Sequence, residues 1–188
     1  MPGQEENDLI EEILKGNSHA FAELVDKYEV QVFNFAMYIL KNREEAEETT
    51  QDTFVNAYRS LKTFRHEAKF STWLLRIAYN NSYTRLRKRK LTLVDVDAKG
   101  VHQSIPGANN IGEETDLQDV RTLLNLALEA LTEDEKTLVT LYYYNEQSVK
   151  EICKITGKNL SNVKVVLHRS RQKMLKKLNE VGIKEWTI

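Results

Sequence analysis

Cationic side chains gather on one face of a helix that we expect near residue 165. Lys164, His168 and Arg171 follow at i, i+4 and i+7, Arg169 lies beside them, and residues 152–179 contain eight Lys and Arg and no acid. Such a face can contact phosphates and donate hydrogen bonds to guanine acceptors. The pattern predicts nucleic-acid binding, although a helical hairpin with a solvated basic face also fits it.

A second cluster combines aromatic rings with cations between residues 61 and 90. Unstacked bases suit such a surface, because each stacking contact contributes about 1–3 kcal/mol. Alternatively, most of these rings belong to the core, and the run 85–90 is a solvated helix end or a nuclear-import patch. The rings are Phe64, Phe70, Trp73, Tyr79 and Tyr83, and the cations are Lys62, Arg65, Lys69, Arg76, Arg85, Arg87, Lys88, Arg89 and Lys90.

A helix-turn-helix is predicted to position the first cluster. Ser148 and Glu151 form a capping-box pair that starts a short helix, and Gly157 ends it in a tight turn. A longer helix begins near Ser161 and carries an apolar stripe for packing on its predecessor. A short scaffold helix, a turn and a basic helix are the elements that major-groove binding requires. The stripe consists of Val163, Val166, Leu167, Ser170, Met174 and Leu178.

Three further segments have apolar or small residues at three-to-four spacing, which predicts amphipathic helices. Thr132 and Glu135 form another capping-box pair, and no segment alternates as a strand should. The three stripes are Phe21, Leu24, Val25, Tyr28, Val32, Ala36 and Leu40; Ala46, Thr50, Phe54, Ala57 and Leu61; and Trp73, Leu74, Ile77 and Ala78, the last continuing into the basic run.

Chain breakers concentrate in the polar segment 93–118. Gly100, Pro106, Gly107 and Gly112 fall there, in a chain of 188 residues with only two prolines and seven glycines. A polar segment without helical period lacks the apolar surface that offsets the entropy of ordering. We therefore predict an all-α fold of two small helical domains, 1–92 and 119–188, joined by an acidic flexible linker over 93–118.

The formal net charge of −1 results from blocks of opposite sign. Residues 1–60 carry 5 basic and 13 acidic residues, and residues 61–92 carry 9 and 1. Residues 93–120 carry 1 and 6, and residues 121–188 carry 12 and 8. Such asymmetry indicates separate faces for separate partners, so a net charge near zero does not argue against a polyanion.

Other function classes find little support in the composition. One cysteine excludes a disulfide framework and a cysteine zinc site, and the four histidines lie far apart. We expect no catalytic residues, no metal and no cofactor, and hence no enzyme. The acidic start MPGQEEND is unlike a signal peptide, and no apolar run reaches the roughly 20 residues of a membrane span. A cytoplasmic protein without membrane insertion is expected.

The chain resembles the sigma-70 family of RNA polymerase sigma factors, specifically the extracytoplasmic-function (ECF) group. AFAELVDKYEVQVFNFA resembles region 2.1 and EEAEETTQDTFVNAYRSLKTF region 2.2. FSTWLLRIAYNNSYTRLRKRK resembles regions 2.3–2.4, and the segment from LTEDEKTLVTLYYY to MLKKL resembles region 4. The resemblance implies a region 2 domain, a linker and a region 4 domain that together give RNA polymerase its promoter specificity.

The resemblance also implies partners and site residues. The partners are core RNA polymerase, through its β′ clamp helices and β flap, promoter DNA, and an anti-sigma factor. Matching residues for core polymerase are Glu48, Gln51, Asp52 and Phe54. Those for the −10 element are Phe64, Lys69, Ser71, Thr72, Trp73, Asn80, Arg87 and Lys88. Those for the −35 element are Asn162, Lys164, Val165, His168, Arg169 and Arg171.

Two departures keep the promoter sequence open. Many family members have an acidic residue where this chain has Thr84, and many have Lys-Ser-Arg where it has Lys164-Val165-Val166. A conventional helix-turn-helix regulator that binds duplex operator DNA is the alternative. That alternative accounts for residues 148–178 but not for the acidic and basic-aromatic blocks before them.

Overall fold

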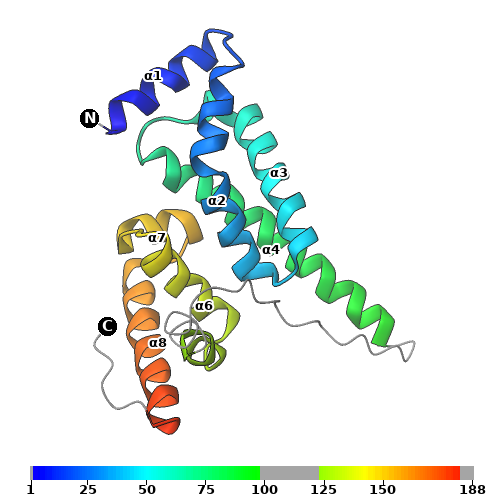
Figure 1. Cartoon of the computed structure of the whole chain (residues 1–188), viewed down its shortest axis with the longest axis vertical. Coiled ribbons are helices and arrows are strands. Elements are labelled where there is room, and N and C mark those ends of the chain that lie inside the picture. Colours follow the sequence, from blue (N-terminus) through cyan, green and yellow to red (C-terminus); the bar gives the residue numbers. More distant parts are fainter. Residues whose placement is uncertain (1, 98–122, 183–188) are drawn as a thin grey trace, which may run out of the picture. The chain divides into compact units, whose positions relative to one another are not determined.

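The computed structural model describes residues 2–97 and 123–182, which fold into two compact helical units (Figure 1). No strand occurs in these described ranges. The all-α prediction with two helical domains is thereby confirmed. Residues 98–122 lie outside the described residues, and with them most of the predicted linker 93–118.

The first unit consists of helices α1 (Pro2–Leu14), α2 (Ala20–Leu40), α3 (Arg43–Ser60) and α4 (Phe70–Asp97), with the short 3₁₀ helix η1 (Leu61–Thr63) after α3. Helices α2, α3 and α4 match the three predicted stripes. Helix α4 continues to Asp97, so its last five residues fall within the segment assigned to the linker. Sequence reasoning did not anticipate α1, whose polar residues leave few apolar anchors.

A two-residue turn makes α2 and α3 an antiparallel pair. Lys41 ends α2 in the left-handed conformation at φ 53°, and Asn42 caps α3 by accepting from the Glu45 N–H at 2.8 Å. The inner face of α3 is lined by small residues, which let the helices approach closely. The buried residues of α3 are Ala46, Thr49, Thr50, Thr53, Phe54 and Ala57.

The buried face of α4 differs in phase from the predicted stripe. Leu74 and Ala78 are buried as predicted, but Leu75 joins them while Trp73 and Ile77 lie at the margin. The Trp73–Leu74–Leu75 run itself contains no polar residue, so it does not fix the phase of the buried face. Packing against α2 and α3 decides which of these apolar side chains is buried.

Helix α1 is fastened to α2 by apolar and polar contacts. Ile10 and Ile13 are buried, Lys27 Nζ binds Glu6 Oε1 at 2.5 Å, and the Tyr28 hydroxyl donates to the same carboxylate. Burial, and then the neighbouring Glu6 carboxylate, raises the pKa of Tyr28 above its ordinary value.

The second unit contains α6 (Glu133–Val139), the π-helical turn η2 (Thr140–Tyr144), α7 (Val149–Thr156) and α8 (Leu160–Glu180). Residues 123–129 before them are also helical. Both predicted capping boxes are present, at Thr132–Glu135 and Ser148–Glu151. Gly157 ends α7 at φ 73°, as predicted, and Asn159 caps α8. The predicted helix-turn-helix is therefore confirmed as α7, a three-residue turn and α8.

Candidate functional site

An acidic edge runs along α3. Glu48, Gln51 and Asp52 are exposed. Gln51 and Asp52 follow Glu48 by one helical turn, so the three side chains form one surface, which we call the α3 acidic edge. Phe54, the fourth residue predicted to bind polymerase, is only 7% exposed and packs its ring edge-on against Phe21. It lies inside the α2–α3 interface because it belongs to the apolar stripe of α3, so in this structure it supports the surface from below.

Two arginines of α4 bind this edge from the neighbouring helix. Arg85 donates to Glu48 and, at 3.3 Å, to Asp52. One turn later Arg89 donates to Glu45 at 3.2 Å and to the Leu40 carbonyl at 3.1 Å. The hydrogen bond to Glu48 raises the pKa of Arg85. These two cations of the basic run therefore form ion pairs within the first unit, which the sequence did not predict.

Other polar and aromatic residues, on α4 and just before it, share a different stripe. Lys69, Trp73, Arg76, Asn80, Thr84 and Arg87 recur at three-to-four spacing, which places them on the side of the helix opposite Arg85 and Arg89. All of them are exposed except Trp73, which is partly exposed. Lys88 is exposed beside the stripe. We call this set of residues, Lys88 included, the α4 outer stripe.

Two of the five aromatic rings of the predicted cluster are buried, and Trp73, Tyr79 and Tyr83 are partly exposed. Phe64 is 9% exposed and Phe70 is 2% exposed, and Trp73 contacts both, with ring centroids 5.3 and 5.6 Å away. Thr72 is buried and Ser71 half-buried. The open alternative that the rings belong to the core is thus correct for Phe64 and Phe70. In this structure Phe64 and Thr72 support the surface from inside, and Trp73 is the ring at its margin.

The N-terminal half of α8 presents the predicted basic face of the second unit. Asn162, Lys164, Val165, His168 and Arg169 are all exposed, while Val163 and Leu167 are buried against the preceding helices. The capping bond from the Asn162 N–H to Asn159 Oδ1, 2.8 Å, fixes where this face begins.

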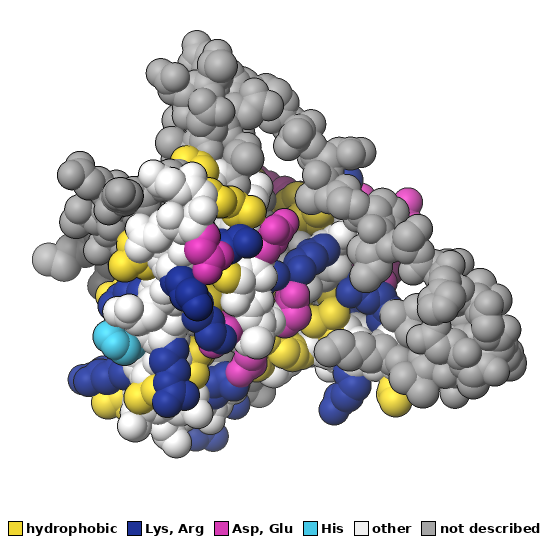
Figure 2. Space-filling view, turned by 90° about the horizontal axis from the view of Figure 1, so that it is seen from below, with side chains coloured by type: hydrophobic (Ala, Val, Ile, Leu, Met, Phe, Trp, Pro, Cys, Tyr) yellow, Lys and Arg dark blue, Asp and Glu magenta, His cyan; other side chains and the backbone are white. Residues whose placement is uncertain are grey.

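Arg171 is held differently from its neighbours. Its Nε donates to the Tyr143 hydroxyl at 2.6 Å, and its guanidinium lies 5.5 Å from the ring centroid of Tyr142. Lys173 Nζ similarly donates to both carboxylate oxygens of Glu135, at 2.8 and 2.9 Å. These contacts fasten α8 to the α6–η2 helix. Figure 2 shows such basic and acidic side chains interleaved on one face of the molecule.

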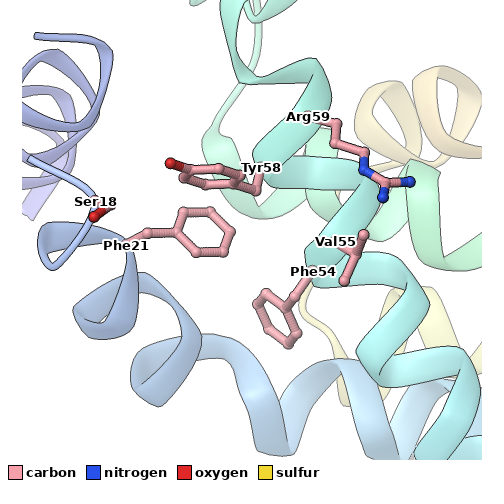
Figure 3. Close-up of a pocket in the computed structure, with 6 residues that line it drawn as sticks. All are labelled: Ser18, Phe21, Phe54, Val55, Tyr58 and Arg59. Atoms are coloured by element: carbon pink, nitrogen blue, oxygen red, sulfur yellow. The ribbon is translucent and has the colours of Figure 1, made fainter. Parts of the chain in front are cut away.

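An apolar hollow of about 330 Å³ opens between α2 and α3, one turn beyond the α3 acidic edge. Figure 3 shows the Phe21 and Tyr58 rings together on one side, with Val55 and Arg59 on the other. Val55 and Tyr58 are each 46% exposed. The sequence predicts apolar stripes that contain Phe21 and Phe54, and it gives no role to Val55, Tyr58 and Arg59. The sequence signal that could have revealed the hollow is the presence of two apolar residues, Val55 and Tyr58, on the otherwise polar side of α3.

Within 2–97 and 123–182, no group of His, Cys, Asp and Glu is placed to hold a metal ion. No helix in those ranges is both long enough and apolar enough to cross a membrane.

Comparisons with known proteins cover both units. The family model for sigma-70 region 2 matches residues 24–92, and that for sigma-70 region 4 matches residues 121–174. The ECF sigma factor SigW of Bacillus subtilis is 30% identical over 179 residues, covering 92% of this chain and 96% of that protein. The ECF sigma-E factor of Haemophilus influenzae is 30% identical over 185 residues, covering 90% and 93%.

Two solved structures share the fold. The sigma factor RpoE of Bartonella quintana, in complex with the anti-sigma factor NepR, superposes with a TM-score of 0.69 at 23% identity, covering 86% of this chain and 98% of that one. CnrH, in complex with the cytosolic domain of CnrY, superposes with a TM-score of 0.65 at 22% identity, covering 92% and 96%.

Proposed function

This chain belongs to the extracytoplasmic-function group of the sigma-70 family of RNA polymerase sigma factors, and we propose how its surfaces divide the work of initiation. The observation that carries the proposal is the separation of charge within the first unit. The α3 acidic edge and the α4 outer stripe belong to different helices, and Arg85 and Arg89 on the inner side of α4 join them.

We propose that the α3 acidic edge docks on the β′ clamp helices of core RNA polymerase. Glu48 and Asp52 retain 67% and 61% side-chain exposure although Arg85 binds one oxygen of each. Their other oxygens remain available to cations of a partner. Charged groups of this kind contribute steering and register more than raw affinity. Phe54 contributes by holding the helix in place.

We propose that the α4 outer stripe opens the −10 element and captures unpaired bases. Unstacking a base step costs a few kcal/mol, which captured bases must offset. Asn80 can both donate to and accept from a base edge, and Trp73 at the margin can stack on a base. Lys69, Arg87 and Lys88 supply the phosphate contacts, with Ser71 beside them.

We propose that α8 enters the major groove at the −35 element. Lys164 and Arg169 contact phosphates or guanine, and Asn162, Val165 and His168 complete the face. Arg171 is expected to act mainly by anchoring α8 to η2. Docking of this unit on the β flap completes the assembly, and no residues are assigned to it.

Regulation by an anti-sigma factor in the cytoplasm is part of the proposal. The structural neighbour RpoE, which is in complex with the anti-sigma factor NepR, supports that partner class by shared fold. The net charge of −1 implies weak binding of the isolated chain to DNA, because acidic surfaces repel the duplex until polymerase covers them.

Run-off transcription with purified core RNA polymerase tests the proposal. The chain should co-elute with core enzyme and support initiation from a cognate promoter in a genomic promoter library. Absence of any transcript across every −35/−10 promoter of the library would refute it. Duplex binding by the free chain, with no effect of core enzyme, would instead favour the conventional regulator.

A further inference from the structure

The outward face of α3 changes character along a single line. Glu48, Asp52, Val55 and Arg59 follow at i, i+4, i+7 and i+11, so they form one stripe along the helix. Its first turn is acidic, its middle is apolar and its last turn is basic. The acidic turn is the α3 acidic edge, and the apolar middle is one side of the hollow in Figure 3.

Packed aromatic side chains line the hollow. Tyr58 packs its ring against Phe21 of α2 with centroids 5.0 Å apart, and Phe54 closes the floor with 7% exposure. Val55 and Tyr58 nevertheless leave almost half of their surface open to solvent. Ser18 and the Arg59 side chain complete the rim. Filling an open apolar recess of this kind with an apolar side chain is favourable, because both surfaces leave water.

We infer that the hollow accepts a large apolar side chain from a helix of core RNA polymerase, and that Val55 and Tyr58 determine specificity for that helix. The inference rests on the proposed docking of the α3 acidic edge, with which the hollow is continuous. A straight stripe fits another helix packed along it. That helix carries basic residues opposite Glu48 and Asp52, the apolar residue opposite Val55, and an acidic residue opposite Arg59.

A second copy of this chain fits the stripe less well. An antiparallel pair of α3 helices that matches Glu48 with Arg59 places Asp52 opposite Val55. That arrangement directs a carboxylate toward the apolar hollow, where an ionised group loses its hydration without gaining a partner. Charge complementarity alone would permit self-association, but the apolar middle of the stripe opposes it.

Neutral substitutions separate this contact from the charged one. Fluorescently labelled full-length chain is titrated with core RNA polymerase as Val55→Ser, Tyr58→Ser and Val30→Ser variants. Val30 is the matched control, because it is 68% exposed on α2 and lies half a helical turn away from Phe21 in phase. We expect about five- to tenfold weaker binding for each hollow variant and a change under twofold for Val30→Ser. Thermal unfolding of each variant checks that all three still fold.

Salt dependence identifies the nature of the contact. The loss caused by Glu48→Gln should shrink as salt is added, whereas the loss caused by Val55→Ser should persist, because apolar burial is not screened. If Val55→Ser and Tyr58→Ser bind as tightly as Val30→Ser, or if their loss disappears in salt, the inference is overturned. A dimer that depends on Val55, with polymerase affinity unchanged, would assign the hollow to a second copy and overturn it as well.

The same titration separates this inference from the proposed docking. If the unmodified chain fails to bind core enzyme, the proposed function and this occupant fail together. If the unmodified chain binds, and Glu48→Gln weakens it but the hollow variants do not, only the hollow is wrongly assigned.

Discussion

Arg85 on α4 donates from Nη2 to Asp52 Oδ2 on α3 across 3.3 Å, and its Nη1 donates to Glu48. Two carboxylates four residues apart on one helix repel each other, and the guanidinium between them relieves that repulsion. The contact joins the helix proposed to dock on polymerase to the helix proposed to open the promoter. We therefore expect Arg85 to act as a positioning residue rather than as a DNA contact.

Arg85→Ala should affect stability and Arg87→Ala promoter binding, although both substitutions remove a cation from the same run. Arg85→Ala should lower the free energy of unfolding by about 1 kcal/mol, since a largely exposed ion pair contributes no more. Arg87→Ala should leave stability within about 0.5 kcal/mol and weaken promoter binding by holoenzyme. Urea denaturation and filter binding measure the two quantities. Equal losses of promoter affinity in both variants would contradict the assignment, and a double-mutant cycle with Asp52→Asn isolates the pair.

Asn80→Ala should impair promoter opening without weakening duplex binding. Asn80 is exposed on the α4 outer stripe, whereas its neighbour Asn81 is half-buried and donates to Thr53 Oγ1 at 3.2 Å. Permanganate reactivity of −10 thymines in the holoenzyme complex should fall about tenfold with Asn80→Ala, for the loss of one base contact. Asn81→Ala is the matched control, expected to lower stability and spare reactivity. Unchanged reactivity in Asn80→Ala would remove it from the base-capture role.

Lys164→Ala should weaken −35 binding and reduce its salt dependence. One lost phosphate contact lowers the slope of log K against log salt by about 0.9. Arg171→Ala should instead destabilise the second unit, because Arg171 binds Tyr143 at 2.6 Å. Mobility shifts of the holoenzyme on promoter DNA at several salt concentrations measure the first effect, and circular dichroism of the chain measures the second. A Lys164→Ala slope equal to that of the unmodified chain would exclude a phosphate contact.

Glu135→Gln should reveal an acid-sensitive brace between α6 and α8. Burial alone would raise the pKa of Glu135, but hydrogen bonds from Lys173 and Thr132 outweigh it and hold the pKa below the ordinary 4.5. A lowered folded-state pKa stabilises the protein above that ordinary value, and the contribution is lost as the pH falls through the folded-state pKa. At pH 7 the free energy of unfolding of the unmodified chain should exceed that of the Glu135→Gln variant by about 1 kcal/mol.

The difference should shrink as the pH falls below 4.5. Glutamine preserves the capping box, so a lost cap would not explain the result. Glu133→Gln is the control, because Glu133 is 44% exposed and its ion pair with Lys136 spans only one turn. A stability difference independent of pH would show that the Glu135 charge plays no part.

The amino-acid sequence determined the local structure and the nature of each surface. Capping boxes at Thr132 and Ser148 and the left-handed stop at Gly157 fix where helices start and end. The spacing of apolar residues fixes the buried faces of α3 and α8, although not that of α4. These signals act within one or two turns, so they are visible without any neighbour. The motif order likewise identified the family, because it depends on sequence alone.

Only the tertiary structure decided which charged and aromatic residues remain on the surface. Arg85 and Arg87 look alike in the run, yet one faces the carboxylates of α3 and the other faces solvent. Arg171 continues the basic face of α8 by spacing, but η2 supplies Tyr143 within its reach. Phe54 and Phe64 are internal, whereas Val55 and Tyr58 line an open hollow. Helical periodicity specifies the direction in which each side chain leaves its helix. The residue that the side chain contacts depends on which neighbouring helix packs there and in what register.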